Sequence, residues 1–92
     1  MLDAQNRLVI GKELIERANF KLREKLNIYY EPEEKRLLLK RLNEDVGEKY
    51  FVSTQLLEVK TRVAIPLSIR NAFPNAKYLP VEKDGEIYIL II

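Results

Sequence analysis

An internal repeat is the feature that most constrains how this chain of 92 residues can fold. Each copy reads as an acidic residue, three further residues, an arginine, three residues ending in isoleucine, a glycine or proline, and a short helical stretch. The two copies are Asp3–Ile15 and Glu58–Arg70. Each is followed by two apolar segments separated by a charged turn. The repeat predicts one structural unit per copy, and it therefore sets the architecture.

Each copy has only about 40 residues, too few for a stable core without a disulfide, a metal or a partner. We therefore expect the copies to pack on each other, on a second chain, or on both. The apolar fraction of 47% against 33% charged residues is typical of a folded protein. The chain has no cysteine and no apolar run of the roughly 20 residues that cross a membrane. This composition predicts a cytoplasmic protein with no membrane partner.

The first copy, within residues 1–42, predicts a strand, a short helix and a hairpin. Leu8–Ile10 is apolar and β-branched, as in a buried strand, and Lys12–Ala18 has apolar residues at helical spacing. Leu26–Tyr30 alternates with a period of two, and Leu37–Leu39 follows a charged turn. The order of elements is therefore β-α-β-β.

The second copy, within residues 50–92, repeats this order after a polar linker at 43–49. A long leading strand at Phe51–Val59 comes first, with Phe51, Ser53 and Gln55 on one face. The expected elements after it are a strand at Val63–Ile65, a helix at Leu67–Phe73 with Pro66 at its first position, and a hairpin of Tyr78–Val81 and Ile87–Ile92. Together the copies predict one compact domain.

The leading strand has no counterpart in the first copy, which predicts an open sheet edge there. An open edge can pair with a second chain. The terminal apolar strand indicates the same, so we expect a homodimer or a higher homo-oligomer.

The motifs Asp3-x-x-x-Arg7-Leu-Val-Ile-Gly and Glu58-x-x-x-Arg62-Val-Ala-Ile-Pro resemble the AbrB/MazE/SpoVT/MraZ swapped-hairpin superfamily. The tandem copies are similar to the MraZ arrangement. The resemblance implies an α+β, mostly β fold in which two units exchange hairpins to form a small, double-psi-type barrel. It also implies a prokaryotic transcriptional regulator that contacts double-stranded DNA through arginine loops.

Four positions depart from the family pattern. Gly11 replaces the expected proline, and Glu58 replaces the expected aspartate. The loop glycine before the arginine is replaced by Asn6 in one copy and Thr61 in the other. Asparagine tolerates the left-handed conformation, whereas a β-branched threonine does so poorly. We therefore expect the second loop to have a different shape and the first copy to bind DNA.

The candidate DNA contacts are basic residues of the two loops and of the first helix. Arg7 and Arg62 suit bidentate contact with phosphates or guanine edges, but each could instead pair with the acid four positions earlier and lock its loop. Basic residues around the first helix could track phosphates or form an ordinary solvated face balanced by glutamates. The full set of candidates is Arg7, Lys12, Arg17, Lys21, Arg23, Lys25, Lys60, Arg62 and Arg70.

The sequence offers little for catalysis. It has no histidine or cysteine, its two serines at 53 and 68 have no recognisable base, and its three glycines form no phosphate loop. We therefore expect that the protein is not an enzyme and that it has neither a cofactor nor a metal site. Two alternatives to a regulator stay open: an antitoxin-like autorepressor with a toxin partner, and a protein-interaction or assembly module that has lost DNA binding.

Overall fold

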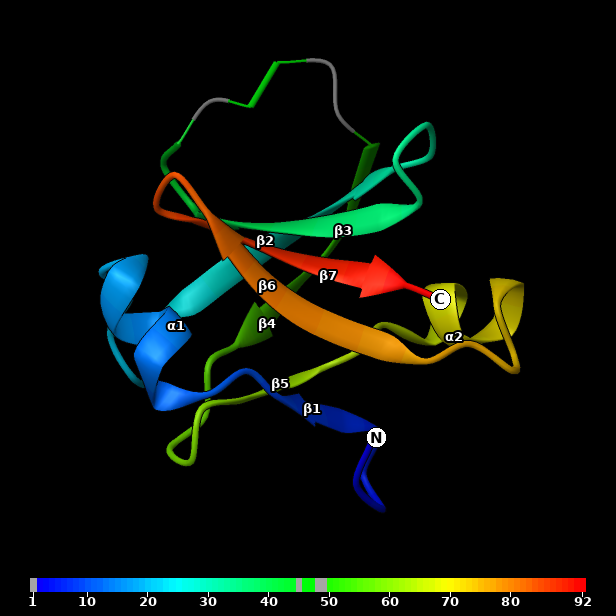
Figure 1. Ribbon diagram of the computed structural model, residues 1–92, viewed down its shortest axis with the longest axis horizontal. Helices are drawn as coiled ribbons and strands as arrows, with labels where there is room; N and C mark the ends of the chain where they lie inside the picture. The colour runs from blue at the N-terminus through cyan, green and yellow to red at the C-terminus, as the bar shows by residue number, and fades with distance from the viewer. Residues whose placement is uncertain (1, 45, 48–49) are drawn as a thin grey trace.

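Strands dominate the regular structure, as the repeat predicted, so the chain is α+β and mostly β. The computed structural model describes residues 2–44, 46–47 and 50–92. The elements follow the chain in the order β1 (Arg7–Val9), α1 (Lys12–Arg17), β2 (Lys25–Glu31), β3 (Arg36–Arg41), β4 (Tyr50–Leu56), β5 (Arg62–Ala64), α2 (Leu67–Ala72), β6 (Tyr78–Lys83) and β7 (Glu86–Ile91) (Figure 1). The linker at 43–49 lies partly outside the described residues.

The strands form two antiparallel sheets. One has five strands in the order β4-β2-β3-β7-β6, and the other is a two-stranded ribbon of β1 and β5. Figure 1 shows the ribbon below the larger sheet, with α1 and α2 at opposite ends of the molecule. Hydrogen bonds do not close the larger sheet, because β4 and β6 each have a neighbour on one side only among the described strands.

Each of the two sheets contains strand pairs formed between the two copies. In the ribbon Leu8 lies opposite Val63, and in the larger sheet β3 pairs with β7, with Leu38 opposite Tyr88. The leading strand β4 belongs to the second copy but pairs with β2 of the first. Because β4 covers the outer side of β2, the strands of the first copy have no open edge in the larger sheet, and the open edges are the outer sides of β4 and β6 of the second copy.

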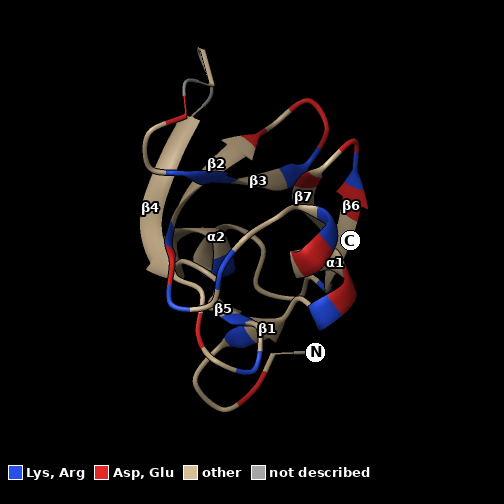
Figure 2. Cartoon of the chain, turned by 90° about the vertical axis from the view of Figure 1, so that its left-hand side faces the viewer, with Lys and Arg blue, Asp and Glu red and all other residues tan. Residues whose placement is uncertain are grey.

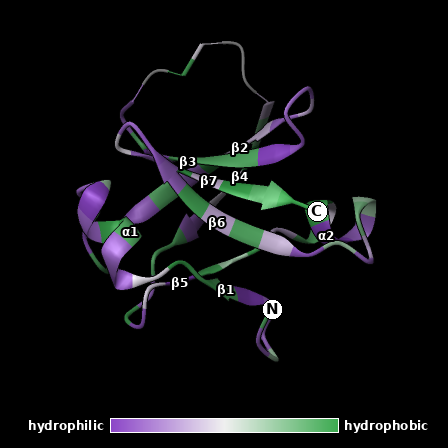
Figure 3. Cartoon of the chain, viewed as in Figure 1, coloured by the Kyte–Doolittle hydropathy of each residue, from purple (hydrophilic) through white to green (hydrophobic). Residues whose placement is uncertain are grey.

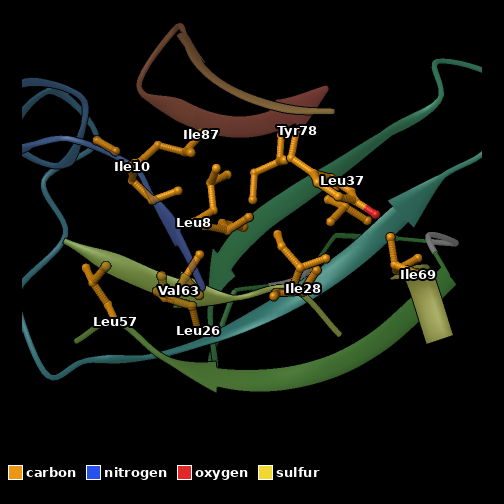
Figure 4. Packing of buried hydrophobic residues seen from close by; sticks show 14 of the residues in the cluster. Leu8, Ile10, Leu26, Ile28, Leu37, Leu57, Val63, Ile69, Tyr78 and Ile87 are labelled. Atoms are coloured by element: carbon orange, nitrogen blue, oxygen red, sulfur yellow. The ribbon is translucent and has the colours of Figure 1, made fainter. Parts of the chain in front are cut away.

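A single hydrophobic cluster fills the space between the ribbon and the larger sheet (Figure 4). The period of two in the strands places alternate apolar side chains on one face of the sheet, and Figure 3 shows apolar residues concentrated in the central strands. Ile28 and Leu39 of the sheet are fully buried, and Leu8 and Val63 of the ribbon pack in the same cluster. Burying each such side chain stabilises the fold by about 1.5–3 kcal/mol.

The alternation expected along β4 changes at a bulge. The strand ends at Leu56, and its register with β2 shifts between Ile28 and Tyr29. As a result Phe51 lies opposite Tyr29, on the outer face of the sheet, whereas Ser53 lies opposite buried Ile28. The prediction that Phe51 and Ser53 share a face is therefore wrong. Both helices also end one residue earlier than predicted, and Pro66 is the residue before α2 rather than its first.

Candidate nucleic-acid interface

The two arginine loops meet at the ribbon in one cluster of four charged residues, which we call the central ion-pair cluster: Asp3, Arg7, Glu58 and Arg62. Asp3 Oδ1 accepts hydrogen bonds from the backbone N–H groups of Gln5 and Arg7, each at 2.9 Å. Arg7 Nε lies 3.0 Å from Asp3 Oδ2, and Arg7 Nη1 lies 2.8 Å from Glu58 Oε1. Arg7 therefore bridges the two copies.

These contacts separate the two roles that the sequence left open for the arginines. The Arg7 side chain is only 16% exposed and pairs with the acid four positions earlier, so it locks its loop. Arg62 differs from Arg7, because the acid four positions before it, Glu58, bonds to Arg7. Arg62 Nη1 instead lies 3.7 Å from Asp3 Oδ2. The Arg62 Nε is buried without a hydrogen-bond partner in the described part of the chain. Neither arginine presents its whole guanidinium group to a ligand.

The pKa of Asp3 lies below its ordinary value, chiefly because the Arg7 backbone N–H donates to the carboxylate. A carboxylate with a lowered pKa stabilises the fold above its unfolded-state pKa of about 3.9, and this contribution is lost as the pH falls through the folded-state pKa. The urea midpoint is expected to fall as the pH drops from 5 toward 3. Asp3→Asn should have a lower midpoint at pH 7 and a weaker pH dependence. An unchanged pH profile in the variant would contradict this role.

The residues before the two arginines have the same left-handed backbone conformation, so the expected difference in loop shape is not found at this position. Asn6 has φ 60° and Thr61 has φ 56°, both left-handed. The hydroxyl of Thr61 explains how a β-branched residue is held there: it accepts a hydrogen bond from the Gly11 N–H at 3.1 Å and donates one to the Lys60 carbonyl at 2.7 Å. Gly11 and Thr61, two of the residues that depart from the family pattern, thus contact each other.

Gly11 itself has φ +104°, a conformation that L-residues rarely adopt. A Cβ added there would meet no atom within 4 Å, so any cost of a substitution comes from the backbone. We expect Gly11→Ala to lower the free energy of unfolding by about 1–3 kcal/mol, measured by urea denaturation. A D-alanine at the same position, introduced by chemical synthesis, should restore stability because its preferred φ is positive. Equal losses for both would contradict a backbone cause.

The basic residues of α1 are accompanied by acids. Arg17 pairs with Glu13 one turn earlier, and its other guanidinium nitrogen lies 3.9 Å from Glu82 of β6. Lys12 lies 3.9 Å from Glu16, but its side chain is 85% exposed, so this pair holds it only weakly. Figure 2 shows acidic and basic segments side by side on α1. The surface of α1 around Arg17 thus has paired positive and negative charges, whereas Lys12 is largely accessible.

The loop after α1 and the first residue of β2 present cations that have no ion-pair partner within the described ranges. Lys21, Arg23 and Lys25 are all exposed. The acid between them, Glu24, forms an ion pair with Arg41, whose Nε lies 3.1 Å from the Glu24 carboxylate. The negative charge of Glu24 is therefore balanced by Arg41. These three cations are therefore available to an anionic partner.

Lys60, also exposed and without an ion-pair partner in the described part of the chain, comes from the second copy and lies beside this loop. The Arg23 N–H donates to the Leu57 carbonyl at 2.6 Å, and the Leu57 N–H donates to the Glu24 carbonyl at 2.9 Å. These bonds hold the loop after α1 against the segment that leads to Lys60. We call the resulting set the basic rim: Lys12, Lys21, Arg23, Lys25 and Lys60.

An apolar hollow adjoins the basic rim, of which Lys12 and Lys60 line it. It has a volume of about 610 Å³ and is lined by Ile15, Phe20, Leu22 and Val59, with Lys12, Glu16, Lys60 and Thr61 at its border. Leu22 is 48% exposed and Val59 44% exposed, so the hollow is open to solvent. Sequence reasoning missed the hollow because its lining comes from segments about 40 residues apart.

Arg70 does not join the basic rim. Its Nε donates to the Ile65 carbonyl at 3.1 Å, which fixes the turn between β5 and α2. The structure therefore divides the predicted contacts into accessible cations of the basic rim and arginines engaged within the fold. The partner of Arg7 in the other copy, Glu58, was also missed, although its place as the acid of the second motif was a usable signal.

Other kinds of site have little support in the described residues. They contain no group of three or more acidic, histidine or cysteine side chains that could hold a metal ion. Among them no helix has the length and apolar character needed to cross a membrane. Comparisons with protein-family models, with curated proteins and with solved structures give no match.

Proposed function

We propose that this chain is an AbrB-like transcriptional regulator that binds duplex DNA through the basic rim. One observation carries the proposal: Lys21, Arg23, Lys25 and Lys60 lie on adjacent segments, are exposed, and have no acidic partner in the described chain. Phosphate contacts by such cations release condensed counterions and supply most of the non-specific affinity of DNA-binding proteins. Arg23 is the member of the rim whose side chain suits bidentate contact with a guanine edge.

The strand registers support the finer architecture that we propose, a swapped-hairpin arrangement of two equivalent units. Arg7 pairs with Ala64 in the ribbon. Its counterpart Arg62 pairs with Val9, so each copy makes the same contact with the other. The pairing of β3 with β7 follows the same relation. In this arrangement a single chain replaces the two subunits of a homodimer, and the central ion-pair cluster joins its halves.

The apolar hollow beside Lys12 and Lys60 of the basic rim favours a second candidate, a protein-interaction module. Exposed apolar side chains surrounded by polar residues are typical of protein contact sites. A peptide with an apolar anchor and acidic flanks would satisfy both features of this surface. An antitoxin role is a special case of this candidate, with a toxin as the partner.

Fluorescence anisotropy with a mixed-sequence duplex across a salt series distinguishes the two candidates. The regulator is expected to bind at low salt, with log K falling against log salt by about 0.9 for each phosphate contacted. With four free cations and Lys12 in the basic rim, we expect a slope of about −3.6 to −4.5. Absence of binding at low salt would reject the regulator and leave the interaction module.

A further inference from the structure

A second hollow lies beside α2, where the second copy repeats the surroundings of the apolar hollow. Ile15 of the apolar hollow corresponds to Arg70 when the two motifs are aligned on their arginines. Its neighbour Glu16 corresponds in the same way to Asn71. Both Arg70 and Asn71 line the second hollow, which we call the Arg70 hollow. The repeat thus forms a hollow beside each helix, but an arginine replaces an isoleucine in the second.

The Arg70 hollow has two adjoining parts. One part, of about 450 Å³, has Leu2, Leu79 and Ile92 among its lining residues. The other part, of about 300 Å³, contains Arg70, and both Leu2 and Tyr78 line the two parts together. Leu79 is 47% exposed and Ile92 62% exposed, so the hollow is open to solvent. Its size and its mixture of apolar walls with a few polar groups are typical of sites for small organic ligands.

The positive charge of Arg70 has no counter-ion in the described part of the chain. Its Nε donates to the Ile65 carbonyl, and no described ion pair includes this arginine. The sequence has no acidic residue between Glu58 and Glu82, so none of the side chains around α2 can balance the charge. A half-buried guanidinium group in this state favours an anion that accepts hydrogen bonds, such as a carboxylate.

Tyr78 supplies a second polar group to the same hollow. Its side chain is 8% exposed, and its hydroxyl is buried without a hydrogen-bond partner among the described residues. Figure 4 shows the ring directed toward the α2 end of the core. Burial raises the pKa of the Tyr78 phenol, and the positive charge of Arg70 opposes this rise. The phenol is therefore protonated at neutral pH. Because buried polar groups in proteins are nearly always paired, this hydroxyl is suited to donate to a ligand.

We propose that the Arg70 hollow binds a small apolar carboxylic acid, with its carboxylate at Arg70 and Tyr78 and its hydrocarbon part against Leu2 and Leu79. The carboxylate balances the charge of the guanidinium group and accepts a hydrogen bond from the phenol. The hydrocarbon part contributes affinity by covering exposed apolar surface. The apolar hollow has Ile15 in place of the arginine, so this carboxylate site belongs to the second copy alone.

Titration of the full chain with octanoate, in the absence of DNA, tests this site separately from the proposed regulator function. We expect one octanoate to bind with a dissociation constant below about 1 mM, measured by calorimetry. Octanol, which has the same chain length but no charge, should bind at least tenfold more weakly. Amide shifts should concentrate in Leu2 and residues 70–79. Equal affinity for the two compounds, no binding of octanoate, or shifts centred on the apolar hollow would overturn the proposal.

Two variants test the polar groups, and circular dichroism verifies that each folds. Arg70→Ile introduces the residue type of the equivalent position in the first copy and should raise the octanoate dissociation constant at least tenfold. Arg17→Ile is the matched control, because it removes the same charge from α1 at the opposite end of the molecule (Figure 1), and it should stay within about threefold of wild type. Tyr78→Phe removes only the hydroxyl and should weaken binding about threefold to tenfold. Wild-type affinity in Arg70→Ile or in Tyr78→Phe would overturn the proposal.

Discussion

Replacing Lys21, Arg23 and Lys25 together by alanine is expected to weaken binding to duplex DNA on the order of a hundredfold. These cations have no acidic partner in the described chain, so each is free to form a charge-assisted contact with a phosphate. Three contacts of about 1 kcal/mol each give this loss, and the slope of log K against log salt should become shallower by roughly 2 to 3. Anisotropy titrations at several salt concentrations measure both quantities.

A matched control removes the same net charge elsewhere. Lys35, Lys77 and Lys83 are also exposed but lie outside the basic rim. Their triple alanine variant should bind DNA within about threefold of wild type. If both triple variants lose the same affinity, binding depends on net charge rather than on the basic rim, and the proposed site is wrong.

Ile28→Ala is expected to lower the free energy of unfolding by about 2–5 kcal/mol. Ile28 is fully buried at the centre of β2, where the sheet packs against the ribbon. The loss combines the transfer free energy of the removed methyl groups with the cavity they leave. It is a large share of the about 5–15 kcal/mol that stabilises a typical domain. Urea denaturation followed by circular dichroism measures it.

Ile92→Ala is the control for this prediction, because it makes the same chemical change at a position that is 62% exposed. We expect its effect to stay within about 0.5 kcal/mol. Since the copies share one hydrophobic cluster, Ile28→Ala should also unfold both halves in a single transition. Two separate transitions in that variant would contradict a core shared between the copies.

The hydrophobic periodicity predicted most elements because their burial follows directly from it. Leu8–Ile10 and Val63–Ile65 were predicted as buried strands, and β1 and β5 do lie there with Leu8 and Val63 in the core. Val9 is 55% exposed, so the first of these runs is only half-buried. The partner of β4 could not be predicted, because a strand's periodicity fixes its buried face but not its neighbour. The bulge opposite Tyr29 was missed for a similar reason: one extra residue breaks the period without changing the composition.

The candidate site was predicted as a set of residue types rather than as an arrangement. The sequence identified Arg7 and named the acid four positions earlier as a possible partner, but the bond to Glu58 depends on tertiary pairing of the loops. It also treated Thr61 as an obstacle to the left-handed conformation. The hydrogen bond from Gly11 that satisfies its hydroxyl joins residues 50 positions apart, which no local rule detects.

The most direct test of the central claim is an amide chemical-shift titration of the ¹⁵N-labelled protein with a short DNA duplex. The account predicts that shifts concentrate in residues 12 and 20–25 and in 57–61, the segments that form the basic rim. Residues of β6, β7 and α2 should change little. Shifts centred on α2 and the β6–β7 hairpin, or no shifts at low salt, would contradict the account.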